Sequence, residues 1–325
     1  MIIITGGAGF IGSAITAELN TRGITDILIV DELGTDQKWK NLRSLEYSDY
    51  MEKGNFLDMI TTASKPVPLA QAVIHMGACS STTETDASYL VRNNFQYTKH
   101  LAEWAVNSGI RFIYASSAAT YGDGSKGFDD NENNIDQLRP LNMYGYSKQM
   151  FDLWAKRNDL LDKIVGLKYF NVFGPNEYHK GPMRSFVLKA FEQINAEGKV
   201  RLFKSHRKDY EHGQQLRDFL YITDAVNMTL FFLENKQAAG LFNIGTGKAR
   251  TWLDLVNAVF AAMGKKADTE FIDMPESIRD QYQYFTEADI TKIRSTGYNK
   301  PTMPLEDAVQ DYVTNYLIPG RHLNE

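Results

Sequence analysis

The stretch Thr5-Gly6-Gly7-Ala8-Gly9-Phe10-Ile11-Gly12 decides the fold of this chain. It follows an apolar run, Ile2–Thr5, that is typical of a buried strand, and it opens a segment, Phe10–Thr21, with apolar residues at helical spacing. Its last three glycines match G-x-G-x-x-G, a spacing that permits a tight turn and close packing of the helix on the sheet. Free N–H groups at the start of such a helix bind phosphates, so the stretch predicts a dinucleotide site.

Short apolar runs alternate with amphipathic segments through the first half of the chain. The alternation predicts the α/β class, a Rossmann-type doubly wound parallel sheet with helices on both faces and ligands at the carboxyl ends of the strands. The expected strands are Ile2–Thr5, Asp26–Val30, Tyr50–Lys53, Ala72–His75, Arg111–Ala115 and Ile164–Tyr169. The expected helices are Phe10–Thr21, Phe56–Ala63, Ala87–Asn107 and Met143–Asn158.

After Gly174-Pro175 this alternation loosens, and no linker rich in Pro, Gly or Ser separates the two halves. We therefore expect a dinucleotide-binding domain over residues 1–174 and a smaller α/β substrate-binding domain mainly over 175–325. Segments near 214–247 are expected to return to the first domain. Helices are predicted at Met183–Glu197, Ile222–Glu234, Thr251–Met263 and Pro304–Tyr316.

The composition narrows the classes of function. A net charge of -5 over 325 residues argues against non-specific binding to nucleic acid, which needs a basic face. No run of 18 apolar residues predicts a membrane span, and the first residues lack the basic segment of a signal peptide. Cys79 is the only cysteine, so no intrachain disulfide can form, which fits a cytoplasmic protein. The six histidines are scattered and form no metal-binding pattern, so we expect no metal.

Charged residues near the second strand bear on the cofactor. Asp31 stands at the end of that strand, 19 residues after Gly12, where an acid can accept hydrogen bonds from the adenosine ribose. Lys38 and Lys53 follow, and either could neutralise the 2′-phosphate of NADP. Judged separately, each of these side chains is more often a solvated surface group, and the glycines favour the cofactor interpretation.

A second pattern points to acid–base chemistry. Tyr144-Gly-Tyr-Ser-Lys148 opens an expected helix, and residues four apart share one face, so the phenol and the amine can converge. A nearby cation favours the tyrosinate, and we expect Lys148 to lower the pKa of Tyr144 toward neutrality. Such a phenol can take a proton from an alcohol as hydride leaves. Ser117, just after the Arg111–Ala115 strand, could bond the reacting oxygen.

Together these motifs resemble the extended short-chain dehydrogenase/reductase family. Three later segments also resemble that family: Tyr169-Phe-Asn-Val-Phe-Gly-Pro175, Arg217-Asp-Phe-Leu-Tyr-Ile-Thr-Asp224 and Phe242-Asn-Ile-Gly-Thr-Gly247. The resemblance implies that Ser117, Tyr144 and Lys148 are the catalytic triad. It also implies a homo-oligomer.

Within that family the chain is most similar to the ADP-heptose 6-epimerases, which act in lipopolysaccharide inner-core synthesis. The similar stretches are Gly77-Ala-Cys-Ser-Ser-Thr-Thr-Glu84, Tyr114–Gly122, His179-Lys-Gly181 and Tyr282–Asp289. By this resemblance Tyr144 and Lys180 divide the proton transfers on two sides of the heptose C6. Bound NAD(P) would oxidise C6 and then reduce it from the other face, and would stay tightly bound between turnovers.

The resemblance assigns further residues to the two ligands. For the cofactor they are Gly6, Gly7, Gly9, Phe10, Ile11, Gly12, Asp31, Glu32, Lys38, Lys53, Asn55, Phe56, Gly77, Ala78, Asn94, Tyr144 and Lys148, with Asn55 and Phe56 flanking the adenine. For the substrate they are Ser80, Ser117, Asn171, Lys180, Phe203, Arg217 and Tyr282. Arg217 would pair with the diphosphate through its planar fork, Phe203 would contact the adenine, and Tyr282 would cover the sugar.

One position departs from the family pattern, and several alternatives remain. The family usually has Asn where this chain has Glu32, whose charge would repel a 2′-phosphate; from Lys38 and Lys53 we still expect NADP, with NAD as the alternative. A 4-epimerase of another nucleotide sugar is the nearest rival, and Lys180 discriminates against it. A 4,6-dehydratase lacks support because Ala118-Ala119 follow Ser117 where an acid would be needed. A non-catalytic dinucleotide sensor would not need the Tyr144–Lys148 pair.

Overall fold

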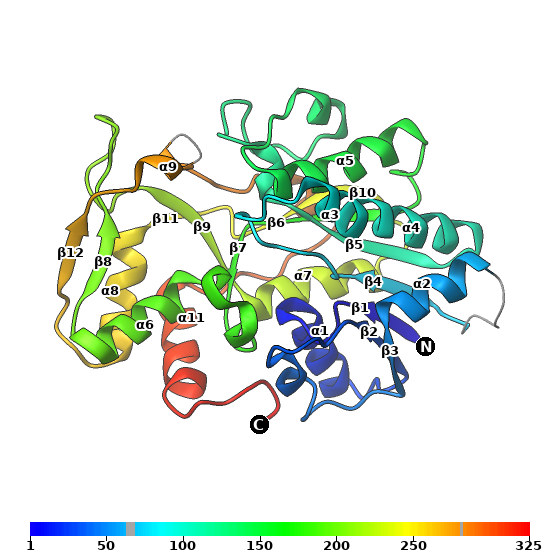
Figure 1. The fold of residues 1–325 in the computed structure, drawn as a ribbon, viewed down its shortest axis with the longest axis horizontal. Helices are drawn as coiled ribbons and strands as arrows, with labels where there is room; N and C mark the ends of the chain where they lie inside the picture. Colours follow the sequence, from blue (N-terminus) through cyan, green and yellow to red (C-terminus); the bar gives the residue numbers. More distant parts are fainter. Residues whose placement is uncertain (63–68, 280–281) are drawn as a thin grey trace.

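The computed structural model describes residues 1–62, 69–279 and 282–325, and Figure 1 shows their arrangement. Seven parallel strands form the main sheet in the order β10-β6-β5-β4-β1-β2-β3. Their bounds are β1 Ile2–Thr5, β2 Ile27–Asp31, β3 Asp49–Glu52, β4 Ala72–His75, β5 Arg111–Ser117, β6 Val165–Tyr169 and β10 Gly240–Ile244. The predicted Rossmann-type sheet is confirmed.

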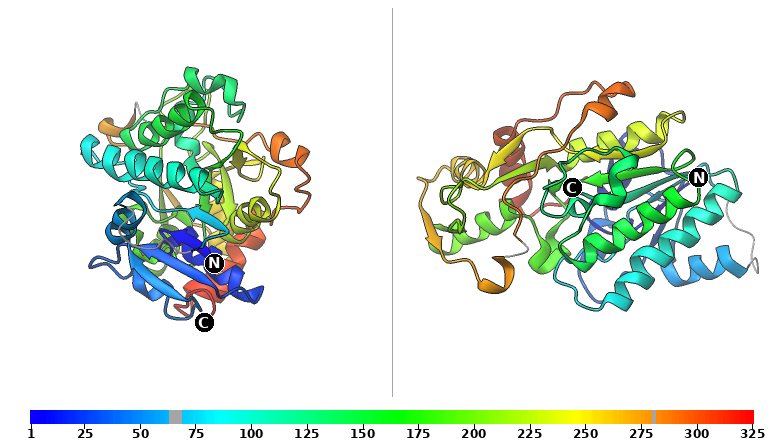
Figure 2. Two further views of the ribbon diagram at one scale, coloured as in Figure 1. Left: turned by 90° about the vertical axis from the view of Figure 1, so that its right-hand side faces the viewer. Right: turned by 90° about the horizontal axis from the view of Figure 1, so that it is seen from above.

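Helices cover both faces of this sheet because its strands are apolar on both sides. In β1, Ile2 and Ile4 pack into the core cluster that holds α1 and α7, whereas Ile3 packs into the cluster that holds α2, α4 and α5. The two layers are visible in the orthogonal views of Figure 2. These helices are α1 Phe10–Thr21, α2 Lys53–Thr62, α4 Tyr97–Asn107, α5 Met143–Arg157 and α7 Ile222–Glu234.

The sequence-based bounds of the helices agree with the structure to within a few residues, with two exceptions. The segment predicted as a single helix over Pro304–Tyr316 continues from α11 (Leu305–Asp311) into the π-helical turn η6 (Tyr312–Leu317). The segment predicted as a single helix over Ala87–Asn107 consists of α3 (Ala87–Leu90), a π-helical turn η2 (Val91–Gln96) and α4. Insertions of this kind re-aim side chains and recur at functional sites. Ala63, the predicted end of α2, lies outside the described residues.

The second half of the chain builds two small sheets beside the main one. One contains β11 (Ala249–Thr251), β9 (Leu216–Tyr221) and β7 (Asn171–Phe173), and the other pairs β8 (Val200–Phe203) with β12 (Thr269–Ile272). After β9 the chain runs through α7 back into the main sheet as β10. Further helices are α6 Phe186–Glu197, α8 Trp252–Ala262, α9 Glu276–Arg279, α10 Thr291–Ser295 and α11 Leu305–Asp311.

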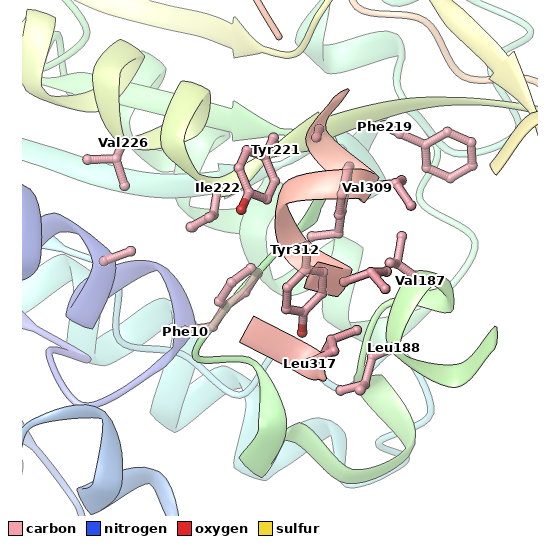
Figure 3. Close-up of a cluster of buried hydrophobic side chains, with 14 of the residues drawn as sticks. Phe10, Val187, Leu188, Phe219, Tyr221, Ile222, Val226, Val309, Tyr312 and Leu317 are labelled. Atoms are coloured by element: carbon pink, nitrogen blue, oxygen red, sulfur yellow. The ribbon is translucent and has the colours of Figure 1, made fainter. Parts of the chain in front are cut away.

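Short helical turns complete the structure: η1 Lys38–Asn41, η3 Ala118–Tyr121, η4 Glu132–Gln137, η5 Tyr178–Met183 and the π-helical η6 Tyr312–Leu317. A shared core joins the two halves, because Phe10 of α1 and Tyr312 of η6 belong to one cluster with Leu188 of α6 and Ile222 of α7 (Figure 3). Across residues 1–62, 69–279 and 282–325, no helix is long and apolar enough to cross a membrane.

Candidate active site

The glycine-rich turn lies at the carboxyl ends of the parallel strands, between β1 and α1. Gly6 has a φ of +66°, and a Cβ there would stand 2.5 Å from the backbone nitrogen of Gly77. A Cβ on Gly12 would stand 2.2 Å from the Gly6 carbonyl oxygen. These contacts explain why the turn needs glycine at both positions, since any side chain would push its neighbours apart.

This turn forms the floor of a cavity of about 530 Å³, a size within the usual range for cofactor and small-molecule sites. A smaller cavity of about 190 Å³ shares part of its lining and extends it past β2. The two cavities adjoin between the acidic end of β2 and the middle of the sheet, because they share the lining residues Gly6, Asp31, Lys38, Gly77, Ala78 and Cys79. The residues predicted for the cofactor that line one cavity or both are Gly6, Gly9, Phe10, Ile11, Gly12, Asp31, Glu32, Lys38, Lys53, Gly77, Ala78, Tyr144 and Lys148.

Two lysine–carboxylate pairs lie at the β2 end of the cavities. The Asp31 carboxylate accepts from the backbone N–H of Ala8 at 2.8 Å and from the Lys38 amine at 2.9 Å. Lys53 pairs with Glu32 and also donates to the Asn93 side chain at 2.9 Å. Each acid is thus matched by one lysine, and Asp31 additionally fixes the glycine-rich turn through Ala8.

The Asn94 side chain stabilises the loop after β4, which lines both cavities. This buried side chain donates to the Cys79 carbonyl at 2.9 Å, accepts from the Cys79 N–H at 2.9 Å and donates to the Ser147 hydroxyl at 3.0 Å. It stands within the π-helical turn η2, which aims it at the loop after β4. The amide therefore ties that loop to helix α5.

Three predicted catalytic side chains meet in the larger cavity, which Ser117, Tyr144 and Lys148 all line. Ser117 ends β5, while Tyr144 and Lys148 occupy successive turns at the start of α5. The Asn142 side chain caps that helix by accepting from the Gly145 N–H at 2.8 Å. A cap at this point sets where the helix begins and hence where the phenol and the amine project.

The electrostatics of the pair differ from the sequence-based expectation. Burial raises the pKa of Tyr144, and a hydrogen bond with Ser117 opposes that rise. Burial lowers the pKa of Lys148 to about 8, partly offset by Asp152, and its amine donates to the Ala115 carbonyl at 2.7 Å. The prediction that Lys148 lowers the pKa of Tyr144 is therefore wrong for this arrangement, because the amine is engaged by the backbone of β5 and Ser117 is the group that favours the tyrosinate.

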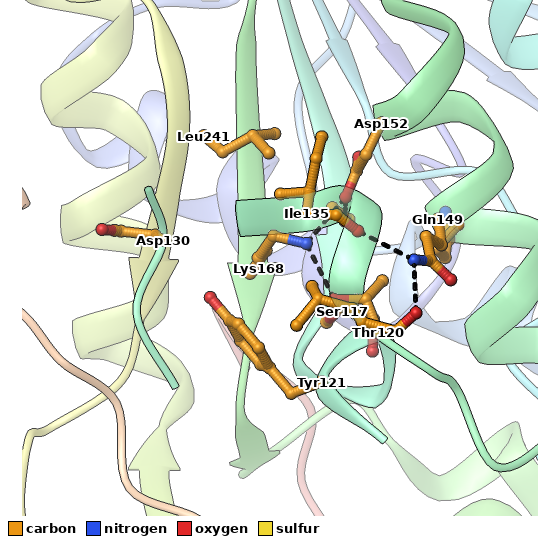
Figure 4. Close-up of polar contacts among 12 residues, drawn as sticks. Ser117, Thr120, Tyr121, Asp130, Ile135, Gln149, Asp152, Lys168 and Leu241 are labelled. Atoms are coloured by element: carbon orange, nitrogen blue, oxygen red, sulfur yellow. Dashed lines mark hydrogen bonds and ion pairs between the residues drawn. The ribbon is translucent and has the colours of Figure 1, made fainter. Parts of the chain in front are cut away.

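A buried polar network supports the strand end that carries Ser117 (Figure 4). Lys168 of β6 and Asp152 of α5 form a fully buried ion pair at 2.7 Å. Asp152 also accepts from the hydroxyls of Tyr114 and Ser116, each at 2.8 Å, and Lys168 donates to Thr120 at 2.7 Å. Strand β5, turn η3, helix α5 and strand β6 are thereby linked directly behind the catalytic side chains.

Lys180 lines the same cavity as Tyr144. It lies in η5, partly buried, with its amine 5.3 Å from the centre of the Phe10 ring. Burial lowers the pKa of Lys180, Glu177 opposes that shift and Lys189 adds to it. The cavity therefore contains a titratable side chain from each of two elements, Tyr144 from α5 and Lys180 from η5.

Not all of the predicted residues reach the cavity. Ser80 and Asn171 line it, whereas the predicted residues that line neither cavity are Gly7, Asn55, Phe56, Asn94, Phe203, Arg217 and Tyr282. Phe56 is fully buried, with its ring 5.7 Å from that of Trp104, because α2 turns the ring into the core; its place beside the adenine stays a prediction. Lys53 and Asn93 occupy that end of the smaller cavity instead.

Arg217 and Tyr282 form a separate group around β9. The guanidinium lies 5.2 Å from the centre of the Tyr282 ring and 5.6 Å from that of Trp252. Arg217 is buried and donates to the Leu216 carbonyl at 2.8 Å and to the Gln283 carbonyl. Among the described residues it forms no ion pair, so it is a buried cation without an acidic partner.

Several residues that line the larger cavity were not predicted from the sequence. Asp36, Met76, Ser81, Phe170, Val172 and Met183 also face the larger cavity. Their positions on either side of the predicted motifs were the available signal, since a loop that carries one site residue usually presents its neighbours to the same space.

Comparison with known proteins identifies relatives over nearly the full chain. The model of the NAD dependent epimerase/dehydratase family matches residues 2–245. The chain is 54% identical over 317 residues, 98% of each chain, to a protein of Nitratidesulfovibrio vulgaris strain Hildenborough named ADP-L-glycero-D-manno-heptose-6-epimerase. It is 48% identical over 326 residues, again 98% of each chain, to a protein of the same name from Fusobacterium nucleatum.

A solved structure of a protein with the same name is also similar to this chain. The crystal structure of ADP-L-glycero-D-manno-heptose-6-epimerase from Helicobacter pylori superposes with a TM-score of 0.81 at 29% identity, covering 97% of this chain and 95% of that one. The chain therefore belongs to the NAD dependent epimerase/dehydratase family and is an enzyme whose cofactor is a nicotinamide dinucleotide.

Proposed function

We propose that this chain inverts C6 of the heptose in ADP-D-glycero-D-manno-heptose, a step of lipopolysaccharide inner-core synthesis. The observation that carries the proposal is the presence of Lys180 in the cavity that also contains Ser117, Tyr144 and Lys148. Inversion needs acid–base groups that serve two faces of one carbon, and α5 and η5 each supply one. The names of the relatives at 54% and 48% identity support the same substrate.

The side chains account for the proton transfers. Tyr144 in its tyrosinate form, which the hydrogen bond with Ser117 favours, takes the proton of the C6 hydroxyl as C6 is oxidised to a ketone, and Ser117 bonds the reacting oxygen. The ketone then turns within the cavity, and Lys180 returns a proton to the oxygen when C6 is reduced from its other face. A proton passes from Tyr144 to Lys180 through solvent before the next turnover, which restores both groups. A bound nicotinamide dinucleotide supplies the hydride acceptor for the first half of this cycle and the hydride donor for the second. The cycle has no net redox change, so turnover would not require release of the cofactor.

The residues that face the cavities fit such a cofactor. The glycine-rich turn cannot accept side chains at Gly6 and Gly12, and it leaves its backbone open to the cavity. Lys148 lines the larger cavity, where its amine would donate to the cofactor as well as to the Ala115 carbonyl. Asn94 would keep the loop of Gly77 and Ala78 against the cofactor through its bonds to Cys79.

For the form of the cofactor we favour NADP. Lys38 and Lys53 both face the smaller cavity, and both oxygens of Asp31 already accept hydrogen bonds from protein groups. Glu32 is matched by Lys53 and so repels a 2′-phosphate less than its charge alone would. Denaturing the purified protein and separating the released nucleotide tests this preference: NADP is expected, and NAD alone would overturn it.

For the diphosphate of the substrate we propose Arg217. A buried guanidinium without an acidic partner is a strong site for a phosphate anion, and its planar fork fits two oxygens. Tyr282 is held at its face and would cover the ligand. Replacing Arg217 by Met is expected to raise KM for the nucleotide sugar by about 10-fold or more, while the same change at the exposed Arg22 is the control. Phe203 is proposed to contact the adenine of the substrate.

Three further expectations accompany this function. The free thiol of Cys79 fits a reducing compartment, which we propose to be the cytoplasm. We keep the division into a dinucleotide-binding part, residues 1–174, and a mainly substrate-binding part, residues 175–325. We also propose a homo-oligomer, which sedimentation of the purified chain would test against a monomer.

A direct comparison of substrates tests the proposed reaction. The purified enzyme is incubated with ADP-D-glycero-D-manno-heptose and, separately, with UDP-glucose, and the products are resolved by chromatography and NMR. Inversion of the heptose at C6 with no change in UDP-glucose is expected. Conversion of UDP-glucose at C4 together with an unchanged heptose would refute the assignment and establish the 4-epimerase alternative.

A further inference from the structure

The turn that carries Lys180 is not part of a long helix, so its position depends on contacts made by its neighbours. Turn η5 spans six residues, Tyr178–Met183, and contains Gly181 at a φ of +53°. A segment this short has no cooperative helical stability of its own. The position of the Lys180 amine therefore depends on contacts that tie η5 and its flanking residues to the rest of the fold, one of which is the Tyr178 hydroxyl on the Arg321 carbonyl at 2.7 Å.

Asn41 provides another such contact. This side chain is 3% exposed and comes from η1, more than 130 residues away in sequence. Its amide nitrogen donates to the carbonyl of Ala8 at 3.0 Å and to the carbonyl of Asn176 at 3.0 Å, and it lies 3.3 Å from Nδ1 of His179. A single buried amide thus joins the glycine-rich turn to the segment that leads into Lys180.

Asn176 provides a third contact and is itself fully buried. Its side chain donates to the Ser13 hydroxyl of α1 at 3.0 Å and accepts from the backbone N–H of Leu323 at 3.0 Å. Its φ is +75°, a conformation that asparagine tolerates better than other side chains and glycine tolerates freely. The residue therefore directs the chain into η5 and bonds to α1 on one side and to the segment after η6 on the other.

We propose that Asn41 and Asn176 are positioning residues that hold the Lys180 turn in register with the glycine-rich loop. These two side chains fix the position of the Lys180 amine relative to the glycine-rich loop. The loop would receive the dinucleotide, and the amine would serve the second face of the substrate. The inference rests on the proposed function, in which Lys180 is an acid–base group. Neither asparagine lines the two cavities that contain the glycine-rich turn and the catalytic side chains, and Asn41 instead lines a separate cavity beside η5. Both residues therefore act on the reaction through the position of Lys180.

The pKa of Lys180 reports how firmly its turn is held, because it depends on the surroundings of the amine. The amine is held over the Phe10 ring, and the titratable groups that face it are Glu177 and Lys189, with His179 beside it in the chain. Burial is the largest cause of its lowered pKa. If the turn loosens, the amine gains water and its pKa returns upward, whereas a general loss of stability elsewhere leaves it unchanged.

The experiment compares three variants of the full chain. Asn41→Ala removes the bridging amide, and Asn176→Gly removes the second amide while keeping a residue that accepts the positive φ. Asn20→Ala is the matched control, because Asn20 makes three similar hydrogen bonds, to Ile24 and Glu46, on the far end of α1. The variants are acetylated with acetic anhydride across a range of pH, and Lys180 labelling is quantified by mass spectrometry with exposed Lys248 as the dose standard.

The midpoint of Lys180 labelling is expected to move to higher pH in Asn41→Ala and Asn176→Gly and to stay at the wild-type value in Asn20→Ala. In the first two variants kcat for the heptose should fall about 10- to 100-fold, with KM changed less than about 3-fold, because misplacing a reacting group lowers the chemical step. An unchanged midpoint in both variants would overturn the inference, and Asn176→Gly keeps the test decisive if Asn41→Ala does not fold. Labelling needs no substrate: a shifted midpoint in a protein inactive on the heptose would uphold the positioning role and reject the proposed function.

Discussion

The buried ion pair behind the catalytic strand yields a quantitative prediction for the substitution Lys168→Met. The side chain has no exposed surface, and its amine contacts Asp152 at 2.7 Å, Thr120 at 2.7 Å and the face of Tyr121 at 5.2 Å. Methionine fills a similar volume but leaves the Asp152 carboxylate buried without a counter-charge. Breaking a buried pair by removing one partner costs about 3–5 kcal/mol, a large share of the roughly 5–15 kcal/mol that stabilises a typical domain.

A double-mutant cycle separates the lost pair from the charge that is left behind. In Lys168→Met/Asp152→Asn the uncompensated charge is gone, while the amide oxygen still accepts from Tyr114 or Ser116. We expect the double variant to be more stable than Lys168→Met alone by about 1–2 kcal/mol, because the cost lies in the unpaired charge. Lys156→Met breaks the exposed pair with Asp136 and is the control, with an expected loss below about 1 kcal/mol.

Urea unfolding followed by fluorescence and circular dichroism measures these free energies. The reasoning predicts a lower midpoint for Lys168→Met with an unchanged denaturant slope, because the folded structure is retained. It would be refuted by a loss below about 1 kcal/mol in Lys168→Met, or by a second substitution that simply adds its own cost to the first.

Three further predictions follow from the site. Tyr144→Phe should fold normally and lower the rate of epimerisation by about 10²- to 10⁴-fold, measured by chromatography of the C6 epimers; an active variant would support a dinucleotide sensor instead. Asn94→Ala should destabilise the fold by about 1–3 kcal/mol, because it unpairs the backbone of Cys79, and should release the cofactor during gel filtration; full retention would show that the loop is held by other contacts. Burial lowers the pKa of Lys148 from 10.5 to about 8, so the folded chain binds fewer protons than the unfolded chain between these values. The stability of the wild type relative to Lys148→Met should therefore rise by on the order of 3 kcal/mol from pH 8 to 10.5, as measured by urea unfolding, and a difference that is constant with pH would contradict the burial of a charged amine.

The local parts of the site could be predicted from the sequence because their geometry follows from neighbours in the chain. A glycine turn between a strand and a helix fixes its own shape, and residues four apart on a helix must share a face. Tyr144 and Lys148 are therefore brought together as expected, and the glycine-rich turn stands where the strand pattern placed it.

The parts that depend on distant contacts could not be predicted from the sequence. Asn41 donates a hydrogen bond to the carbonyl of Asn176, 135 positions away, and no periodicity in the sequence predicts such a contact. Phe56 was predicted by resemblance to flank the adenine of the cofactor, but α2 turns its ring into the core beside Trp104. Lys148 was expected to act on Tyr144 by proximity alone, whereas the Ala115 carbonyl engages its amine.

The most direct test of the account is the incubation of purified protein with ADP-D-glycero-D-manno-heptose without added cofactor, followed by separation of the C6 epimers. The account predicts conversion to the L-glycero form by the wild type, and none by Tyr144→Phe or Lys180→Met. The result that would contradict it is no conversion by a wild-type protein shown to contain its nucleotide.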